Sequence, residues 1–508
     1  MKSARGDALA TLSGVLLALS FPKFGHGSIA WVALAPLLIA LHSARGFRAL
    51  RLGYVTGAVS ALGLLYWTSY VVVQFGGLSM PIGIAVMVLL CLAFAVFPAL
   101  FGWVVGRFVE SVGTDGLLLA PFVWVATEVL RAHTFFSFPW CLVGYSQVDN
   151  APFAQLARFG AVYAVSFVVV GASCVFAFVA VESDAARRRR AVVGYLTLLA
   201  LVGGDGFWRL QHPPVETGRV RVGLVQASIA QDEKWDAAFA VENLDRHLAL
   251  SERAAAEGAK LVVWPESSVP YYYDDTPEIA EKLRAHASRL GIHLLFGNDD
   301  HESVPPRRTF VGAKMLDPGG ELTLRYHKIR LVPFGEYVPL KPLLTLGGRV
   351  AAKVVQQVAD FSPGTTPITG PYEGHTLSTT ICYEAIFADL SRQFSLAGSE
   401  LLVNITNDGW YGRTSAPYQH FAMARMRAIE NGRYLVRAAN TGVTAVVDPA
   451  GRVLARTALF ERTTLVRDVP FVSETTFYAR HGDVFAWGCL GATIALVAAT
   501  LRRRGATL

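Results

Sequence analysis

The chain has 508 residues, of which 53% are hydrophobic and only 17% are charged. That composition is too apolar for an ordinary soluble domain, and it excludes a disordered chain or a disulfide-rich secreted scaffold. The formal net charge is +7, and this excess of positive charge lies beside the long apolar runs and not on a face of the polar segment, where basic and acidic residues nearly balance. Charge and composition together indicate a membrane protein and not a nucleic-acid-binding protein.

About eight apolar segments are candidate membrane spans, because roughly 20 apolar residues in a helix cross the hydrocarbon core of a bilayer. These segments are 8–22, 27–43, 52–74, 80–105, 116–130, 158–181, 191–208 and 483–501. Basic residues gather at alternate ends of the spans, at Lys2, Arg5, Arg45, Arg48, Arg51, Arg107, Arg187 to Arg190 and Arg502 to Arg504. This bias predicts that both termini are cytoplasmic and that residues 215–480 lie on the opposite side.

Glu128 and Arg131, near the end of the fifth span, are expected to form an ion pair.

Residues 215–480 are of a different kind, because short β-branched runs alternate there with helical patterns. Strands are predicted at 220–226, 260–264, 292–296, 378–382 and 400–405, and helices at about 236–257, 277–290 and 417–432. Turn signals at 317–320 and 448–451 separate further strands. This alternation predicts an α/β layered domain. The expected domains are a transmembrane bundle of seven spans at 1–213, the α/β domain at 214–480, and a last transmembrane helix with a cytoplasmic tail at 481–508.

Cys382 is the one cysteine of the α/β segment, and the chain contains no Cys-x-x-Cys pair, which argues against a zinc site. A lone thiol of this kind is either an inert core side chain or a nucleophile. The run from Ser378 to Cys382 places the thiol at the end of a predicted strand. That position favours the nucleophile, because open α/β sheets assemble their sites at strand ends.

Two other predicted strand ends carry ionisable residues, namely Glu266 and Lys328. A carboxylate, an ammonium group and a thiol can together transfer an acyl group. The carboxylate takes the thiol proton, the sulfur attacks a carbonyl carbon, and the cation stabilises the oxyanion. Because a carboxyl group and a thiol have ordinary pKa values of about 4.3 and about 8.5, we expect a partly desolvated site in which Lys328 favours the thiolate.

Glu266, Lys328 and Cys382 resemble the Glu-Lys-Cys triad of the nitrilase superfamily. Three further runs, at 20–25, 138–147 and 327–339, extend the likeness over the whole chain, which resembles the apolipoprotein N-acyltransferase family, the membrane-embedded branch of that superfamily. The resemblance implies a membrane α-helical bundle of about eight spans with an extracytoplasmic nitrilase-like domain, an αββα sandwich. Ser267 and Ser268 stand where relatives often carry Thr and Ala, a departure that does not touch the triad.

The resemblance also implies a reaction. An acyl chain from a membrane phospholipid passes to Cys382 as a thioester, and then to the N-terminal α-amino group of a diacylglyceryl-cysteine apolipoprotein. Glu266 is the implied general base and Lys328 the implied oxyanion stabiliser. One thiol serving two substrates predicts ping-pong kinetics. The implied partners are the phospholipid donor, the apolipoproteins and the lipid bilayer, without a cofactor or a metal. The implied location is the bacterial inner (cytoplasmic) membrane, with the catalytic domain on the periplasmic side.

Further candidates are substrate-binding positions around the triad. Trp235, Tyr383 and Trp410 match aromatic positions that shape the family's substrate entrance, with simple packing as the alternative. Glu336 and Glu384 flank the triad, where they either bind the amine or hold Lys328, with solvated loop acids as the alternative.

Two other functions stay open at this point. A membrane-tethered amidase or other nitrilase-type hydrolase uses the same triad with water in place of the amine. A non-enzymatic membrane receptor or transporter needs a polar pathway through its spans, yet apart from Glu128 the spans hold almost no ionisable residues. The run at 340–348 combines leucines with glycines and is either a lid that dips into the bilayer or a packed loop.

Overall fold

The structure is a computed structural model that describes most of the chain in two compact units. The described residues are 2–134, 137–234, 236–302, 305, 307–339 and 360–505. The helical unit comprises Met1–Pro213, Thr414–Glu430 and Thr476–Leu508, and the sheet unit comprises Pro214–Arg413 and Asn431–Thr475.

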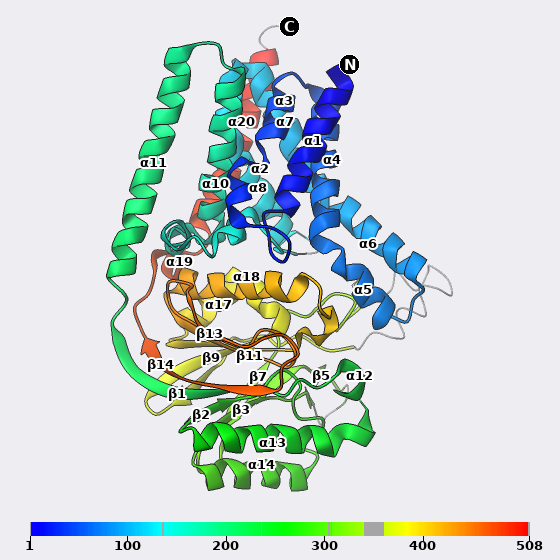
Figure 1. Ribbon diagram of the computed structural model, residues 1–508, viewed down its shortest axis with the longest axis vertical. Helices are drawn as coiled ribbons and strands as arrows, with labels where there is room; N and C mark the ends of the chain where they lie inside the picture. Colours follow the sequence, from blue (N-terminus) through cyan, green and yellow to red (C-terminus); the bar gives the residue numbers. More distant parts are fainter. Residues whose placement is uncertain are drawn as a thin grey trace. The chain divides into compact units, whose positions relative to one another are not determined.

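The helical unit is built from α-helices joined by loops and 3-10 turns (Figure 1). Its α-helices are α1 (Lys2–Ala18), α2 (Ala30–Ala33), α3 (Ala35–His42), α4 (Gly46–Leu65), α5 (Trp67–Gln74), α6 (Met80–Phe94), α7 (Val96–Val112), α8 (Ala120–His133), α9 (Ala151–Ala154), α10 (Ala157–Val181), α11 (Ala185–Gln211), α18 (Ala416–Asn431), α19 (Phe477–His481) and α20 (Val484–Gly505). The 3-10 turns are η1 (Gly27–Ile29), η2 (Gly113–Leu119) and η3 (Val143–Gln147).

Glycines let α4 and α7 approach each other closely. A Cβ atom added to Gly53 of α4 would lie 2.1 Å from the carbonyl oxygen of Pro98 in α7. A Cβ atom added to Gly102 of α7 would lie 2.5 Å from the carbonyl oxygen of Ala49 in α4. Small residues at such contacts are typical of helix packing in a bilayer, where lipid tails are as apolar as the side chains and close backbone approach supplies the attraction.

Glu128 and Arg131 lie on α8, but the structure gives them different partners. Glu128 Oε1 accepts hydrogen bonds from Trp124 Nε1 at 2.9 Å and from the backbone N–H of Val143 at 2.8 Å. The Arg131 guanidinium donates to the carbonyl oxygen of Trp140 at 2.8 Å. The two side chains therefore do not make the direct ion pair that was predicted, because each has a closer polar partner, although their opposite charges still attract each other.

Four helical stretches in the described part of the chain are long and apolar enough to cross a membrane. They are Met80–His133, which contains α6, α7 and α8, together with Ala157–Val181, Ala185–Gln211 and Val484–Arg502. The bent pair of α4 and α5 would be a fifth. The first stretch covers two of the predicted spans, 80–105 and 116–130. The N-terminal part therefore contains several apolar helices, while the count of about eight spans and the orientation stay predictions.

In its described residues, the sheet unit forms two six-stranded sheets and a two-stranded sheet. The first large sheet has the order β14-β1-β2-β3-β6-β7, the second has the order β13-β12-β11-β10-β9-β8, and β4 pairs with β5. The strands are β1 (Glu216–Gln226), β2 (Leu261–Val263), β3 (His293–Gly297), β4 (Asp300–His301), β5 (Thr309–Phe310), β6 (Gly312–Leu316), β7 (Leu322–His327), β8 (Thr369–Tyr372), β9 (His375–Ile381), β10 (Leu401–Thr406), β11 (Tyr434–Ala439), β12 (Ala445–Val447), β13 (Val453–Arg456) and β14 (Thr463–Val472). Three adjacent strands are parallel in each large sheet, β1-β2-β3 and β9-β10-β11, and antiparallel strands flank them.

Helices connect the parallel strands, as the right-handed crossover of a parallel sheet requires. In Figure 1, α13 and α14 lie along the first sheet. The helices of this unit are α12 (Gln231–Lys234), α13 (Ala240–Ala256), α14 (Pro277–Leu290) and α17 (Ala388–Leu396), with 3-10 turns η4 (Ala237–Phe239), η6 (Cys382–Ile386) and η7 (Asp408–Tyr411). The predicted helix at 277–290 and the predicted turns between β6 and β7 and between β12 and β13 are confirmed. The layered α/β class is confirmed as well.

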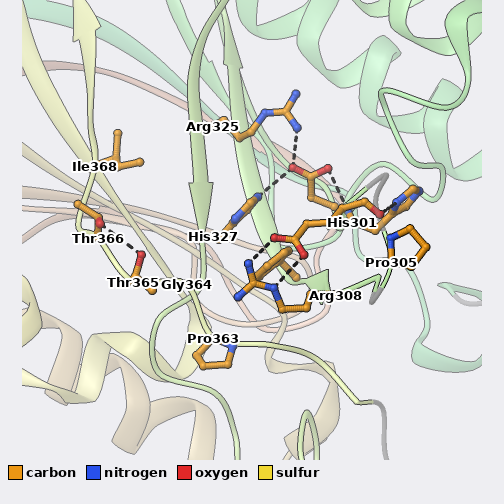
Figure 2. Close-up of a pocket in the computed structure, with 13 residues that line it drawn as sticks. His301, Pro305, Arg308, Arg325, His327, Pro363, Gly364, Thr365, Thr366 and Ile368 are labelled. Carbon is orange, nitrogen blue, oxygen red and sulfur yellow. Dashed lines mark hydrogen bonds and ion pairs between the residues drawn. The ribbon is translucent and has the colours of Figure 1, made fainter.

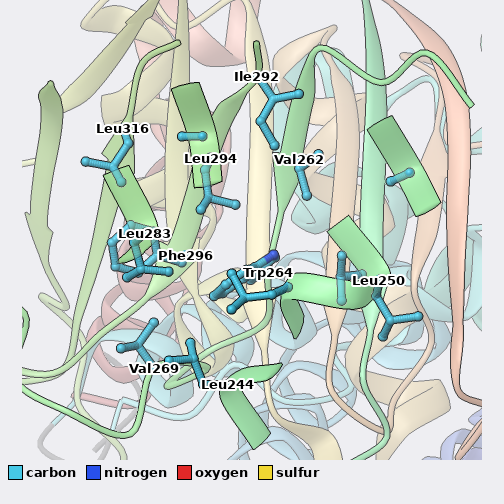
Figure 3. Packing of buried hydrophobic residues seen from close by; sticks show 14 of the residues in the cluster. Leu244, Leu250, Val262, Trp264, Val269, Leu283, Ile292, Leu294, Phe296 and Leu316 are labelled. Atoms are coloured by element: carbon cyan, nitrogen blue, oxygen red, sulfur yellow. The ribbon is translucent and has the colours of Figure 1, made fainter. Parts of the chain in front are cut away.

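A hydrophobic core lies between the first sheet and helices α13 and α14 (Figure 3). The completely buried Trp264 lies within it, close to Leu244 of α13 and Phe296 of β3. The indole Nε1 of Trp264 donates to Ser251 Oγ of α13 at 2.7 Å, so the one polar atom of the ring is satisfied. This packing fixes the backbone two residues before Glu266.

Candidate active site

Three strands of the sheet unit lead into residues that carry chemistry. Lys328 directly follows β7, Cys382 directly follows β9, and Glu266 comes three residues after the end of β2. All three positions are at the carboxyl ends of their strands, where sites in open α/β sheets form.

Lys328 joins two carboxylates. Its Nζ donates to Glu266 Oε1 at 3.1 Å and to Glu336 Oε1 at 2.5 Å. The lysine side chain is completely buried. Burial by itself would lower the pKa of Lys328, but the charges of Glu266 and Glu336 raise it well above its usual value. Lys328 therefore remains a cation at any physiological pH.

Glu336 is a half-buried partner of the lysine, with 15% of its side chain exposed, and not a solvated loop acid. Its Oε2 accepts the backbone N–H of Val332 at 2.8 Å, so both carboxylate oxygens are engaged. Burial raises the pKa of Glu336, and the Lys328 charge acts against that rise. The side chain thus holds the lysine as a second carboxylate partner beside Glu266.

Cys382 begins η6 with a backbone φ of +50°, in the left-handed region that non-glycine residues rarely adopt. The residue is buried, with 4% of its surface exposed. Burial raises the pKa of the Cys382 thiol, the Glu266 charge raises it further, and the Lys328 charge lowers it. Lys328 therefore favours the thiolate, as expected, but burial outweighs the lysine and the pKa of the thiol stays above its usual value. The thiol keeps its proton until a base removes it.

Glu384 connects the strand ends that carry Lys328 and Cys382. Its Oε1 accepts the Tyr326 hydroxyl at 2.8 Å and the backbone N–H of Ile329 at 2.6 Å. Its Oε2 accepts the backbone N–H of Ile381 at 2.8 Å. Burial raises the pKa of Glu384 to about 7, and these hydrogen bonds act in the opposite direction. Glu384 is therefore a buried link between two loops, which excludes the solvated alternative.

The predicted aromatic positions have different outcomes. Tyr383 is buried, and its ring centre lies 5.1 Å from that of Phe387 in an edge-on contact. Trp410 is half-buried in η7. Trp235 and the run at 340–348 lie outside the described residues, so their proposed roles stay predictions.

Two contacts of Glu266 were missed by the sequence reasoning. The backbone N–H of Asn407 donates to Glu266 Oε2 at 2.9 Å. The buried Lys234 donates from Nζ to the backbone carbonyl oxygen of Glu266 at 2.6 Å. A backbone amide leaves no trace in the sequence. Lys234 does neighbour the singled-out Trp235, but a buried lysine has no signature that separates it from an exposed one.

Gly297 at the end of β3 allows the Glu266 loop to lie against the sheet. A Cβ atom added to Gly297 would lie 2.4 Å from the backbone nitrogen of Ser267 and 2.6 Å from the carbonyl oxygen of Pro265. Both atoms belong to backbone that cannot yield easily. The glycine therefore sets how closely the carboxylate loop approaches β3.

A separate cavity of about 940 Å³ opens on the first sheet (Figure 2). Its polar lining is paired internally: His327 Nε2 and Arg325 contact Asp300 Oδ2 at 2.9 and 2.7 Å, and Arg308 pairs with Glu302. Glu266, Lys328 and Cys382 are not among its lining residues. His327, the last residue of β7, lines the cavity, whereas its sequence neighbour Lys328 does not.

The arrangement as a whole can perform acyl transfer through a covalent intermediate. A protonated thiol, a carboxylate and a permanent cation interact electrostatically in one buried place, and hydrogen bonds hold the carboxylate and the cation. Within the described ranges, no group of three or more His, Cys, Asp or Glu side chains is placed to hold a metal ion.

Comparison with known proteins gives consistent results over the whole chain. Residues 221–477 match the family model described as carbon-nitrogen hydrolase, and residues 13–175 match the apolipoprotein N-acyltransferase N-terminal domain. A protein named apolipoprotein N-acyltransferase from Geobacter metallireducens is 40% identical, with 98% of this chain and 96% of the relative covered. A protein of the same name from Methylococcus capsulatus is 34% identical, with 98% and 96% covered. Among solved structures, an amidase from Nesterenkonia sp. is 22% identical, with a TM-score of 0.39 and 53% of this chain and 95% of that chain covered.

Proposed function

The chain belongs to the apolipoprotein N-acyltransferase family, and from this premise we propose that it moves an acyl chain from a membrane phospholipid to the N-terminal α-amino group of a diacylglyceryl-cysteine apolipoprotein. It is an acyltransferase with a carbon-nitrogen hydrolase domain and a helical N-terminal part. The observation that carries the mechanism is the buried group in which Lys328 contacts Glu266 while both charges act on the Cys382 thiol.

The first half of the reaction makes a thioester. Glu266 takes the proton of the Cys382 thiol, and the sulfur attacks the ester carbonyl carbon of the phospholipid. Lys328 and the backbone N–H of Tyr383 stabilise the oxyanion of the tetrahedral intermediate. The C–O bond then breaks, and the proton held by Glu266 passes to the departing alkoxide, which leaves as a lysophospholipid. The raised pKa of Cys382 supports this order, because the thiol needs a base at the moment of attack.

The second half of the reaction makes an amide. The α-amino group of the apolipoprotein attacks the thioester carbonyl carbon, and Glu266 accepts the proton that the nitrogen loses. The C–S bond breaks, and the Cys382 thiolate takes that proton back from Glu266. One thiol therefore serves both substrates in ping-pong order.

The remaining residues position this chemistry. Glu336 holds Lys328, and Glu384 keeps the loops of Lys328 and Cys382 together, as their hydrogen bonds support. We assign Tyr383, Trp410 and Trp235 to the walls of the substrate entrance.

The membrane helices suit a lipid donor. Lifting an acyl chain of about 16 carbons from lipid into water costs roughly 12 kcal/mol at about 0.8 kcal/mol per CH₂. An enzyme joined to apolar helices avoids that cost, and both lipid-anchored substrates reach it by lateral diffusion. We place it in the bacterial inner membrane with residues 214–480 on the periplasmic side and both termini in the cytoplasm.

Of the two alternative functions, the receptor or transporter is excluded and the hydrolase needs an experiment. The receptor or transporter is set aside, because the chain belongs to a family of acyltransferases. Hydrolysis of the thioester by water uses the same triad and differs only in the acceptor, so the experiment must supply an amine.

The test is the mass of Cys382 after exposure to phospholipid. We expect wild-type protein in detergent with phospholipid to gain one acyl group, which hydroxylamine removes and which Cys382→Ala never gains. A diacylated lipopeptide with a free N-terminal amine should then receive the label as an amide. Absence of an adduct on wild-type Cys382 would overturn the proposal. Release only as free fatty acid in the presence of the lipopeptide would identify a hydrolase.

A further inference from the structure

Lys234 is a second buried lysine beside the catalytic carboxylate. It ends the short helix α12, only 6% of its surface is exposed, and its Nζ donates to the backbone carbonyl oxygen of Glu266 at 2.6 Å. Lys328 contacts the Glu266 carboxylate, whereas Lys234 contacts the Glu266 backbone. The two lysines thus hold one residue at different atoms.

The segment that carries Lys234 is itself held in place. Asn440 forms two hydrogen bonds with the backbone of Ile229, at 2.9 Å to its N–H and 2.8 Å to its carbonyl oxygen. The Asn407 amide donates to Gln231 Oε1 at 2.7 Å, and the Asn407 backbone N–H contacts Glu266. The segment that carries the Lys234 ammonium group is therefore hydrogen-bonded to the Asn407 loop, which also binds the Glu266 carboxylate.

The positive charge of Lys234 offsets an excess of carboxylate charge around Glu266. Glu266 and Glu336 both contact Lys328, which leaves one negative charge in excess in this buried place. Asp299 adds a third carboxyl group, and the charges of both glutamates contribute to raising the pKa of Asp299 above its usual value after burial. The groups whose charges raise the pKa of Lys234 are Glu266, Asp299 and, once it has lost its proton, Cys382; the nearby His247 stays neutral because burial lowers its pKa to about 3.

Resting on the proposed function, we propose that Lys234 is a positioning residue of the acylation step, which holds the Glu266 backbone and offsets the surplus carboxylate charge so that Glu266 stays available as a base. Lys234 is not required to touch either substrate. Burial lowers the pKa of Lys234 to about 8, and the neighbouring negative charges limit that drop. The cation is therefore present below about pH 8 and lost as the pH rises through that value.

The experiment follows thioester formation on Cys382 by intact mass, in the full chain in detergent with phospholipid, from about pH 6 to about pH 10. We expect the wild-type rate to decline on the alkaline side as Lys234 loses its proton near pH 8. We expect Lys234→Met to acylate about 10- to 100-fold more slowly, with a phospholipid KM within about twofold and without that decline. Lys282→Met is the matched control, because Lys282 is an exposed lysine of the same unit that pairs with Asp245.

Lys234→Arg keeps a charge throughout this pH range and should acylate faster than Lys234→Met at high pH, with its alkaline decline abolished. The inference is overturned if Lys234→Met acylates at the wild-type rate. It is also overturned if the folded Lys234→Met protein keeps the wild-type decline in rate at alkaline pH. Should either variant fail to fold, a wild-type rate that stays flat across pH 8 still overturns it. A wild-type protein that never gains the acyl group refutes the proposed function itself, so the two failures are distinguishable.

Discussion

Lys328 is the residue whose removal has the clearest expected result. Glu266 and Glu336 would be left facing each other without a cation, and loss of one partner of a buried ion pair costs about 3–5 kcal/mol. We expect Lys328→Met to lower the Tm and to abolish thioester formation. In the double variant Lys328→Met/Glu336→Gln the surplus carboxylate is gone, so part of the lost Tm should return while acylation stays absent. Thermal unfolding and the mass of Cys382 measure the two effects, and acylation of either variant at the wild-type rate would contradict the assigned role.

Some residues of the site can be identified from the sequence, and others cannot. Glu266, Lys328 and Cys382 stand out because a carboxylate, a lysine and a thiol directly after apolar strands have few structural uses. Lys234 does not stand out, because its importance depends on burial and on a backbone carbonyl oxygen that comes from a distant part of the chain.

The contact between α4 and α7 depends on close packing of the two helices at Gly53. A Cβ atom on Gly53 would lie 2.1 Å from a backbone oxygen, which neither helix can accommodate without moving. We expect Gly53→Ala to destabilise the protein by about 1–3 kcal/mol, as overpacking does, seen as a lower Tm in detergent. Gly194→Ala in α11 is the control, because a Cβ atom there has no neighbour within 4 Å. That variant should keep or slightly raise the Tm, and an equal loss in both would argue against close packing as the cause.

Elements were predicted well where a periodic pattern ran uninterrupted. The helix at 277–290 begins and ends where expected, since Pro277 suits the first turn and Gly291 adopts the left-handed conformation that ends a helix. Membrane segments were harder, because hydropathy reports which residues avoid water but not where a helix bends. The segment 52–74, for example, is divided between α4 and α5 with a bend of 53°.

Orientation across the membrane is a property of the whole molecule. The arginines at 187–190 are expected in the cytoplasm and residues 214–480 in the periplasm. The five native cysteines are all buried, so a cysteine introduced at an exposed position can be labelled selectively. With a membrane-impermeant maleimide on intact spheroplasts, Arg462→Cys should react, and Ser183→Cys should react only after the membrane is permeabilised. The reverse pattern would contradict the proposed topology.

The amino-acid sequence was sufficient to predict the classes of structure, and it indicated the chemistry that we propose. Long apolar segments flanked by arginine require a bilayer, alternating strands and helices require a layered domain, and three reactive residue types at strand ends indicate acyl transfer. These are local properties, which short segments of the sequence are enough to show. Only the tertiary structure decided that Cys382 is a protonated thiol, that Glu384 links two loops, and that Lys234 reaches the Glu266 backbone. Those facts depend on burial and on contacts between residues far apart in the chain, which set the cost of a charge and which no local pattern encodes.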